Sequence, residues 1–258
     1  MSDYISYKEI PSHLGLRRGG VVFVSSDITN LGLNCMEHGE KFSTNALIDA
    51  FLDTIGPNGT LIFPTYNWGF CQGKTFDYHK TKCETGALGI TALKRPDFKR
   101  TRHPIYSFAV AGKYQTELCG YDNISSFGND SPFAFLERQN AQNVIIGVVY
   151  SHCFTLMHYF EQKYGISYRY EKNFTGNYID ENGVESKRSY SMYVRDLDLD
   201  VQNDMEEMGK EMESKGVSKF LIINEVPIKI VEVGKCDPLF KDDILNNKSK
   251  KICKYVGQ

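Results

Sequence analysis

The stretch Gly20-Val21-Val22-Phe23-Val24-Ser25-Ser26-Asp27 decides the fold class. Its first part is a short run of β-branched and aromatic residues, which is typical of a buried strand, and its last part is a polar loop. Residues 60–63 and 144–149 repeat the apolar pattern and predict two further strands. Polar loops at the ends of such strands are common places for functional sites, so we expect a site after residue 24.

Segments with helical spacing separate these strands. Ser43 or Thr44 can cap a helix that ends at the turn Gly56-Pro57-Asn58-Gly59. Further helices are predicted at residues 86–93, from Ser131-Pro132 onward, and at residues 154–164. This alternation predicts an α/β fold, with a layered mixed sheet flanked by helices.

The C-terminal third has a different pattern. Asp180-Glu181-Asn182-Gly183 predicts a hairpin turn, and residues 166–200 are expected to form a β-rich excursion on the substrate side of one domain spanning residues 1–258. Residues 201–215 predict a charged helix, followed by a second hairpin. A last helix from Asp237-Pro238 is expected to end in a solvated segment at residues 248–251.

Composition limits the possible functions. The chain is 41% hydrophobic with a net charge of -2 and a pI near 6.3, so we expect a cytoplasmic protein that binds neither nucleic acid nor a membrane. The seven cysteines have no CxxC spacing, which predicts reduced thiols and no metal site. Composition does not decide whether the chain forms a homo-oligomer.

The histidines are the best candidates for catalytic residues. The chain lacks phosphate-binding loops, GxGxxG, GxSxG and HExxH, which argues against nucleotide hydrolysis, dinucleotide redox chemistry and zinc proteolysis. His103, His152 and His158 lie near strand ends, whereas the other three histidines lie in polar stretches. His158 could accept a proton near neutral pH, or it could be a buried core histidine with satisfied hydrogen bonds. His103 could face a ligand or simply cap a turn.

Several motifs occur together in one order. They are Val24–Ile28 followed by Gly32, Gly56–Tyr66, Thr85–Leu88, Arg102–Gly112, Phe127–Phe133, and Ile146–Val148 followed by Thr155–His158. In order and spacing they resemble the motifs of the aminoglycoside 3-N-acetyltransferase family, over about residues 15–200.

The resemblance implies direct acyl transfer from acyl-CoA to an amine, with His158 as the general base. It implies that an acidic residue orients the imidazole, and it leaves Asp198 (or its neighbour Asp196) and Glu161 as alternatives. The residues that would line the coenzyme and oxyanion region are Ser25, Ser26, Asp27, His103, Pro104, Ser107 and Thr155.

Departures from the family pattern bear on the acceptor. Antibiotic-modifying relatives usually carry His at the position of Ser25. Arg and Lys suit phosphate oxygens and Tyr suits sugar or base rings, so the residues expected to bind substrate are Tyr66, Trp68, Tyr168, Arg169 and Tyr178. This favours a dTDP- or UDP-linked deoxy-amino sugar of O-antigen or capsule synthesis, accepting acetyl or a short 3-hydroxyacyl group from acetyl-CoA or 3-hydroxybutanoyl-CoA. The alternatives are an aminoglycoside 3-N-acetyltransferase that confers antibiotic resistance, and a non-catalytic protein that binds CoA or a nucleotide sugar.

Overall fold

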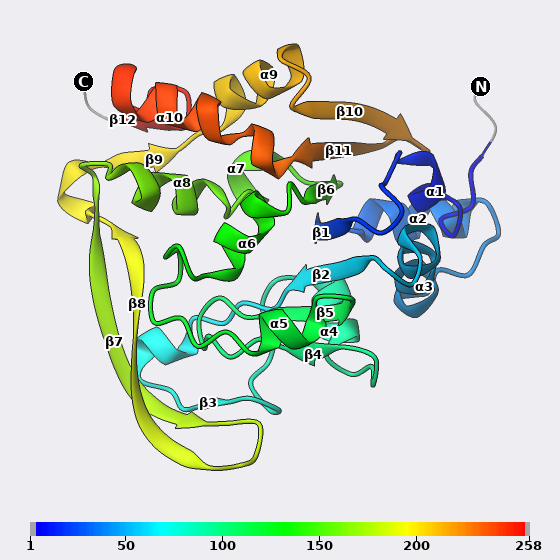
Figure 1. The fold of residues 1–258 in the computed structure, drawn as a ribbon. Coiled ribbons are helices and arrows are strands. Elements are labelled where there is room, and N and C mark those ends of the chain that lie inside the picture. The colour runs from blue at the N-terminus through cyan, green and yellow to red at the C-terminus, as the bar shows by residue number, and fades with distance from the viewer. Residues whose placement is uncertain (1–3, 256–258) are drawn as a thin grey trace.

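The computed structural model describes residues 4–255, so residues 1–3 and 256–258 of the predicted domain lie outside the described range. The main sheet contains β1 (Val21–Ser26), β2 (Thr60–Pro64), β4 (Lys99–Arg100), β5 (Phe108–Gly112), β6 (Gln142–Ile146), β10 (Ser218–Ile223) and β11 (Val226–Glu232). Its strand order is β10-β11-β6-β1-β2-β5-β4 (Figure 1). The central strands β6, β1 and β2 are parallel, and the outer pairs are antiparallel. The mixed α/β sheet predicted from the sequence is therefore confirmed.

One face of the sheet is covered by the N-terminal helices α1 (Ile10–His13), α2 (Thr29–Glu37) and α3 (Thr44–Ile55), together with α4 (Ala87–Ala92). Their buried residues pack with Val22 and Val24, which point to this face of β1. Ser43 caps α3, because its hydroxyl accepts a hydrogen bond from the Ala46 N–H at 3.4 Å.

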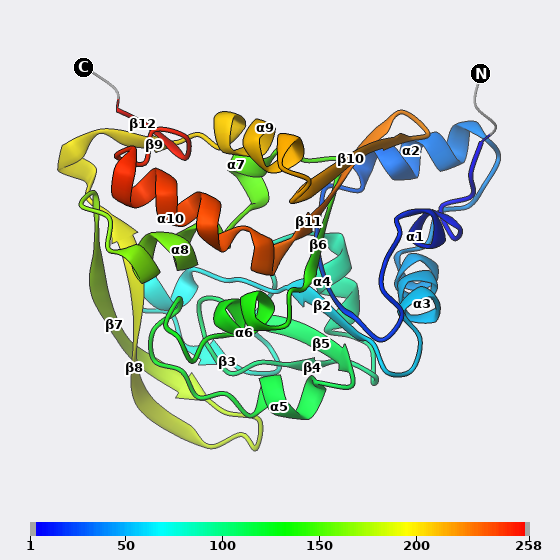
Figure 2. The same cartoon turned by 45° about the horizontal axis from the view of Figure 1, so that its top comes forward.

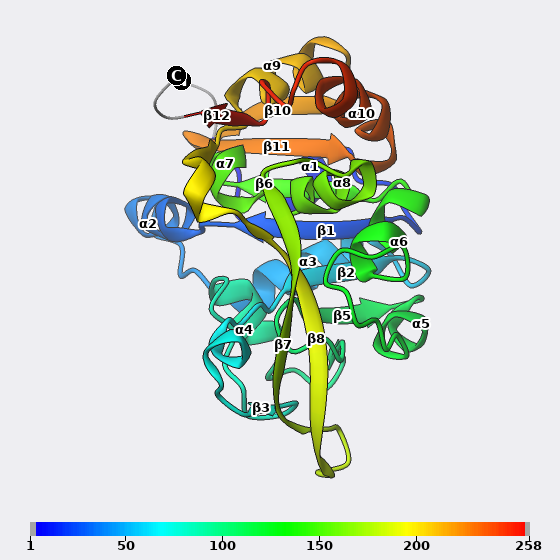
Figure 3. The same ribbon diagram turned by 90° about the vertical axis from the view of Figure 1, so that its left-hand side faces the viewer.

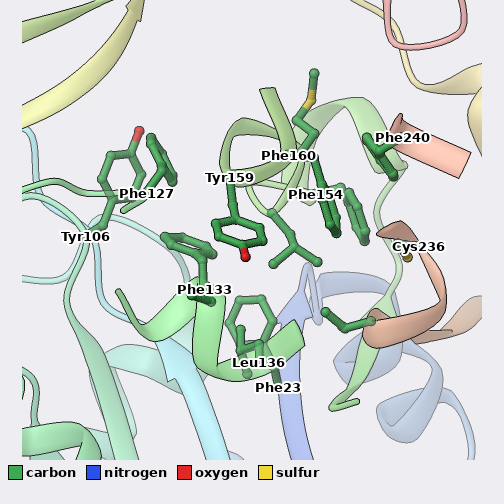
Figure 4. Close-up of a cluster of buried hydrophobic side chains, with 14 of the residues drawn as sticks. Phe23, Tyr106, Phe127, Phe133, Leu136, Phe154, Tyr159, Phe160, Cys236 and Phe240 are labelled. Atoms are coloured by element: carbon green, nitrogen blue, oxygen red, sulfur yellow. The ribbon is translucent and has the colours of Figure 1, made fainter. Parts of the chain in front are cut away.

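The opposite face carries α6 (Pro132–Arg138), α8 (Met157–Tyr164), α9 (Glu206–Ser214) and α10 (Asp237–Asn246). Figure 2 shows α8 and α10 on the far side of the sheet from α1 and α3. Aromatic rings fill the space between this helical layer and the sheet, with Phe23 of β1 below and Phe160 of α8 stacked on Phe240 at 4.6 Å (Figure 4). This packing fixes α8 against this face of the sheet.

A long hairpin borders the same side of the molecule. Strands β7 (Arg169–Ile179) and β8 (Glu185–Arg195) form a twisted ribbon (Figure 3), joined at its far end by the short strand β3 (Phe76–Asp77). The hairpin predicted around Asp180–Gly183 is confirmed, and its strands are longer than the sequence pattern indicated. The remaining short helices are α5 (Gln115–Cys119), α7 (Tyr150–Cys153), η1 (Gly69–Gln72), η2 (Leu197–Leu199) and η3 (Val233–Lys235).

The C-terminal region differs from two expectations. The helix predicted at residues 201–215 begins only at Glu206, because Val201–Asn203 forms strand β9 and pairs with β12 (Cys253–Tyr255). The segment at residues 248–251 is solvated only in part: Lys248 and Lys250 are exposed, but Ser249 is buried and the buried carboxylate of Asp243 accepts a hydrogen bond from the Lys251 N–H. The charged residues around these two short strands hide the pairing of β9 with β12 from sequence analysis.

The helix predicted at residues 154–164 begins later than expected, because a break separates it from the preceding short helix α7. Phe154 has a non-helical backbone conformation, with φ -82° and ψ 60°, and it ends α7. The chain then turns and α8 begins at Met157. His158 is consequently the second residue of a helix whose start lies above the sheet edge.

Candidate active site

A cavity of about 610 Å³ opens where the parallel strands β1, β2 and β6 end. Its lining comes from the loops after these strands, from the segment before α4, and from the α7–α8 connection. The lining residues are Ser25, Ser26, Asp27, Ile28, Thr29, Pro64, Tyr66, Trp68, Glu84, Thr85, Gly86, Ala87, Tyr106, Val148, His152, Cys153, Thr155 and His158. The carboxyl end of a parallel sheet is where α/β proteins bind ligands, as expected from the first strand.

Close approach of the backbone shapes one wall of this cavity. Gly147 follows β6 with φ of 68°, and a Cβ atom there would lie 2.3 Å from the Asp27 carbonyl oxygen. The Asp27 N–H donates to the Ile146 carbonyl at 2.9 Å. Any side chain at this position would collide with the Asp27 backbone, so glycine is needed for the ends of β1 and β6 to approach this closely.

His158 enters the cavity from α8. Its Nδ1 lies 2.5 Å from Glu161 Oε2, and its side chain keeps 16% exposure while that of Glu161 is fully buried. A neutral imidazole in this contact carries its proton on Nδ1, because a carboxylate only accepts hydrogen bonds. Nε2 is then left with a lone pair, the atom a general base needs.

Glu161 is itself held by the beginning of the long hairpin. The Tyr168 hydroxyl donates to Oε1 at 2.7 Å. Arg169 Nε lies 2.8 Å from Oε2 as an ion pair without the alignment of a hydrogen bond. Burial acts to raise the pKa of Glu161, but His158, Arg169 and Tyr168 outweigh it and hold that pKa below its ordinary value.

The pKa of His158 lies below its ordinary value of 6.5. Burial is the main cause, and the neighbouring Arg169 charge adds to it, while Glu161 acts in the opposite direction. A neutral imidazole therefore lies beside an ionised carboxylate at neutral pH, which is the protonation state required of a base.

The cavity brings together about half of the predicted site residues. His158, Ser25, Ser26, Asp27, Thr155, Tyr66 and Trp68 line it. The residues that do not line it are Glu161, His103, Pro104, Ser107, Tyr168, Arg169, Tyr178 and Asp198. Most members of this second set have identifiable structural partners.

His103 caps a turn, which is the alternative that the sequence left open. Its Nδ1 accepts hydrogen bonds from the N–H groups of Ile105 and Tyr106 at 3.3 and 3.2 Å. Its Nε2 lies 3.3 Å from the Ile124 carbonyl, and burial lowers the pKa of His103 to about 4. Both ring nitrogens are thus used inside the protein.

Ser107 is likewise committed to internal contacts. Its hydroxyl donates to the Thr65 carbonyl at 2.8 Å and accepts from Arg100 Nε at 2.9 Å. Arg100 is buried and donates its other N–H groups to backbone carbonyls. This network joins the ends of β2 and β5 beneath the cavity.

The residues expected to contact a nucleotide diphosphate face inward. Arg169 donates to Asn203 Oδ1 at 3.0 Å and Tyr193 O at 3.4 Å, besides pairing with Glu161. The buried Tyr178 donates to the Arg102 carbonyl at 2.8 Å. No Lys or Arg of the described chain lines the cavity, whereas two carboxylates, Asp27 and Glu84, do.

Asp198 lies outside the cavity and is exposed in η2. Its backbone N–H donates to Asp196 Oδ1 at 3.1 Å. The carboxylate that contacts the imidazole is Glu161, the other alternative from the sequence.

Sequence reasoning missed Glu84, Thr85, Gly86, Tyr106 and Cys153 as lining residues. Thr85-Gly86 belonged to one of the recognised motifs, which was the available signal. Glu84 lies in an irregular loop, where no periodicity distinguishes a cavity carboxylate from a surface one.

The described residues give two further findings. Within residues 4–255, His, Cys, Asp and Glu side chains form no group of three or more that could hold a metal ion. In the same range, every helix is too short or too polar to cross a membrane.

Comparison with known proteins gives a consistent family. Residues 23–236 match the family model described as aminoglycoside 3-N-acetyltransferase. The chain is 24% identical to an SPbeta prophage-derived aminoglycoside N(3')-acetyltransferase-like protein, YokD, of Bacillus subtilis, over 93% of this chain and 92% of that protein.

Solved structures share the fold. Aminoglycoside acetyltransferase AAC(3)-Xa superposes with a TM-score of 0.79 at 18% identity, covering 94% of this chain and 93% of its own. A binary complex of AAC-IIIb with CoASH gives a TM-score of 0.77 at 16% identity, covering 95% and 98%.

These findings correct the expected acceptor. The nucleotide-linked amino sugar and the role in O-antigen or capsule synthesis are wrong, because the matching family and relatives are aminoglycoside acetyltransferases by description. The inward-facing Arg169 and the acidic cavity give the physical reason. The family match covers most of the chain, so acyl-CoA is the co-substrate. The chain belongs to the aminoglycoside 3-N-acetyltransferase family and is an acyl-CoA-dependent N-acyltransferase.

Proposed function

We propose that the enzyme transfers an acetyl group from acetyl-CoA to an amino group of an aminoglycoside, and so confers resistance to it. The observation that carries this proposal is the pairing of His158 with the buried Glu161 on the wall of an acidic cavity. Relatives named for the same reaction support the acceptor class.

His158 is the general base. Its Nε2 takes a proton from the acceptor amine as the nitrogen attacks the thioester carbonyl carbon. The new C–N bond forms, the C–S bond breaks, and the CoA thiolate leaves and recovers the proton from the imidazolium. Glu161 holds the ring through Nδ1 and stabilises the positive charge that develops on it.

The charge of the cavity suits a polycationic acceptor. Asp27 and Glu84 line it, and hydrogen bonds from Thr29 lower the pKa of Asp27, so this carboxylate is ionised at neutral pH. Opposite charges attract an ammonium-bearing sugar and raise its local concentration, while they repel a diphosphate. Glu84 also accepts a hydrogen bond from the Asn67 amide at 2.9 Å, which fixes its position beside Trp68.

The sequence predicts Ser25, Ser26, Asp27 and Thr155 on the coenzyme side and Tyr66 and Trp68 on the acceptor side, and all six line the same cavity. The hairpin at residues 166–200 acts on the site indirectly. Its Tyr168 and Arg169 orient the Glu161 carboxylate, which in turn orients the base.

The test is release of free CoA thiol from acetyl-CoA and from 3-hydroxybutanoyl-CoA, with kanamycin, gentamicin and sisomicin as acceptors. We expect turnover with acetyl-CoA and an aminoglycoside product heavier by one acetyl group. His158→Asn should reduce kcat by about 10²- to 10⁴-fold, because the base acts in the transition state. Turnover only with a non-aminoglycoside amine would refute the proposed acceptor, and an unchanged rate in the variant would refute the role of His158.

Glu84→Gln tests the electrostatic argument separately. We expect a higher KM for the aminoglycoside with the KM for acetyl-CoA unchanged, since only the acceptor is cationic. Glu117→Gln is the matched control, because Glu117 bonds the Tyr121 hydroxyl outside the cavity. Equal effects of the two substitutions would contradict a local contact at Glu84.

A further inference from the structure

Two hydroxyl groups in the wall of the cavity are buried without a hydrogen-bond partner. They are Ser25 Oγ and Tyr66 Oη, and each residue is only 3% exposed. Buried polar atoms in folded proteins nearly always have partners, because an unpaired one costs free energy. Orphaned hydroxyls at a reaction site therefore indicate a partner that arrives with the substrate.

The two hydroxyls come from neighbouring strands and the same face of the sheet. Strands β1 and β2 are parallel, with Phe23 opposite Ile62, so Ser25 ends one strand beside the chain that continues from Pro64 to Tyr66. Phe23 and Tyr66 both belong to the core cluster beneath α8, and side chains two residues apart on a strand share a face. Ser25 and Tyr66 thus lie on the face that α8 covers, where His158 enters the cavity.

Tyr66 is held rigidly. Its ring packs edge-on against Tyr106 at 4.8 Å and Phe108 at 5.4 Å, and it also contacts Phe133. Burial, with a smaller effect of Tyr106, raises the pKa of Tyr66 well above its ordinary range, so the phenol stays protonated and can only donate or accept as a neutral group. A fixed, protonated donor that is itself buried is suited to stabilising a developing negative charge.

Other hydroxyls near the cavity are already used or solvated. Ser107 and Thr65 bond one another at 2.9 Å, and the Thr85 hydroxyl donates to the Pro64 carbonyl at 2.9 Å. Ser26 and Thr155 are only half-buried, so water can satisfy them. Thr155 also lies near the Tyr66 hydroxyl and acts to lower the pKa of Tyr66, but the two side chains do not meet with hydrogen-bond geometry. Tyr66 and Ser25 remain as the lining hydroxyls in the described chain that burial leaves without a partner.

We infer that Tyr66 Oη and Ser25 Oγ donate hydrogen bonds to the acyl thioester carbonyl oxygen and stabilise the oxyanion formed when the amine attacks. This inference rests on the proposed acyl transfer and names the donors for it. As the C–N bond forms, the carbonyl π electrons move onto oxygen, and both hydroxyls keep their protons throughout. As the C–S bond breaks, the electron pair on oxygen re-forms the carbonyl double bond and the C–S electrons leave with the thiolate sulfur.

Tyr66→Phe removes one oxygen atom and tests the inference. We expect kcat to fall by about 10²- to 10³-fold with little change in the KM for acetyl-CoA, as when an oxyanion donor is lost. The melting temperature should stay the same or rise, because an unpaired buried hydroxyl is removed. Ser25→Ala should behave in the same direction with a smaller loss of rate.

Tyr150→Phe is the matched control. The buried Tyr150 hydroxyl bonds Ser218 Oγ at 2.6 Å outside the cavity, so its removal should lower the melting temperature and leave kcat unchanged. A lower melting temperature with unchanged kcat in Tyr66→Phe would make that hydroxyl structural and overturn the inference. A rise only in the acceptor KM would assign it to acceptor binding and would also overturn it.

Infrared difference spectra of acetyl-CoA labelled with carbon-13 at the thioester carbonyl need no acceptor. A donor to the oxygen shifts the carbonyl stretch to lower frequency, and we expect this shift in the natural protein and its loss in Tyr66→Phe. Bound acetyl-CoA with an unshifted carbonyl would refute the donors alone. Failure of acetyl-CoA to bind would refute the proposed function and the donors with it, and binding without aminoglycoside turnover would refute the acceptor while leaving the donors testable by the spectrum.

Discussion

Replacing Glu161 by Gln tests the centre of the site with a change of one charge. The substitution keeps the side-chain shape but removes the negative charge 2.5 Å from His158 Nδ1 and 2.8 Å from Arg169 Nε. Arg169 would remain 8% exposed at its side chain without a counter-ion, and the Tyr168 hydroxyl would face an amide.

The magnitude follows from these distances. Unit charges 2.8 Å apart interact by about 6 kcal/mol at an effective dielectric constant of about 20. Desolvation offsets part of that energy, and removing one partner of a buried pair lowers the free energy of unfolding by about 3–5 kcal/mol. The imidazolium of the transition state loses the same carboxylate, so we expect kcat to fall by about 10²- to 10⁴-fold.

The assay is CoA release under saturating acetyl-CoA, with the unfolding free energy measured by urea on the same preparation. Glu137→Gln is the control, because Glu137 also pairs with a cation and a tyrosine hydroxyl, at Lys163 and Tyr159, but does not line the cavity. It should lose stability and retain kcat. A folded Glu161→Gln protein with full kcat would refute the orienting role of the carboxylate.

Four further outcomes are expected. Because the pKa of His158 lies below 6.5, kcat/KM should rise with pH through an inflection below that value, and an inflection above 6.5 would contradict the burial argument. The free energy of unfolding, measured with urea, should fall as the pH is lowered below 6.5. The reason is that the lowered pKa values of His158 and Glu161 make the unfolded state bind more protons than the folded state there. An unfolding free energy that stays constant between pH 6.5 and 4.5 would contradict this. Asp198→Asn should leave the rate unchanged, since Asp198 is exposed outside the cavity, and a loss comparable with Glu161→Gln would restore it as the partner. Gly147→Ala should lower the melting temperature and activity together, because its Cβ would lie 2.3 Å from Asp27 O at a φ of 68°, whereas Gly183→Ala in the open hairpin turn controls for positive φ alone.

The order of strands and helices was predictable because the core is built from local patterns. The burial of apolar strands such as β1 and of amphipathic helices such as α3 can be predicted from the spacing of their apolar residues. The pairing of β9 with β12 could not be predicted, because each strand has three residues and the partners are about fifty residues apart in sequence. Short strands among charged residues carry no period that distinguishes them from a helix or a loop.

Site residues were predictable where a loop leaves a central strand, and less so elsewhere. Ser25, Ser26 and Asp27 line the cavity because the parallel strands all end at the same edge of the sheet, and this holds whatever path their loops then take. His103 and Ser107 do not line it for a different reason. Because β5 runs antiparallel to β2, the chain before β5 reaches the same edge and Tyr106 lines the cavity, but the Ser107 hydroxyl and the His103 imidazole are used in local hydrogen bonds.

Arg169 explains why composition suggested the wrong acceptor and how the base is tuned. An arginine among tyrosines in the sequence is equally consistent with a phosphate ligand and with a buried counter-ion, since the guanidinium fork suits either carboxylate or phosphate. In the fold it faces Glu161, where it lowers two pKa values: that of the carboxylate, which favours its charged form, and that of His158, which favours its neutral form. Glu161 alone would favour the protonated imidazole, which cannot act as a base. Burial, together with the cation behind the carboxylate, keeps His158 neutral before reaction. In the proposed mechanism the carboxylate still stabilises the imidazolium as it forms, and the long hairpin that delivers Arg169 contributes to catalysis without contacting the substrate.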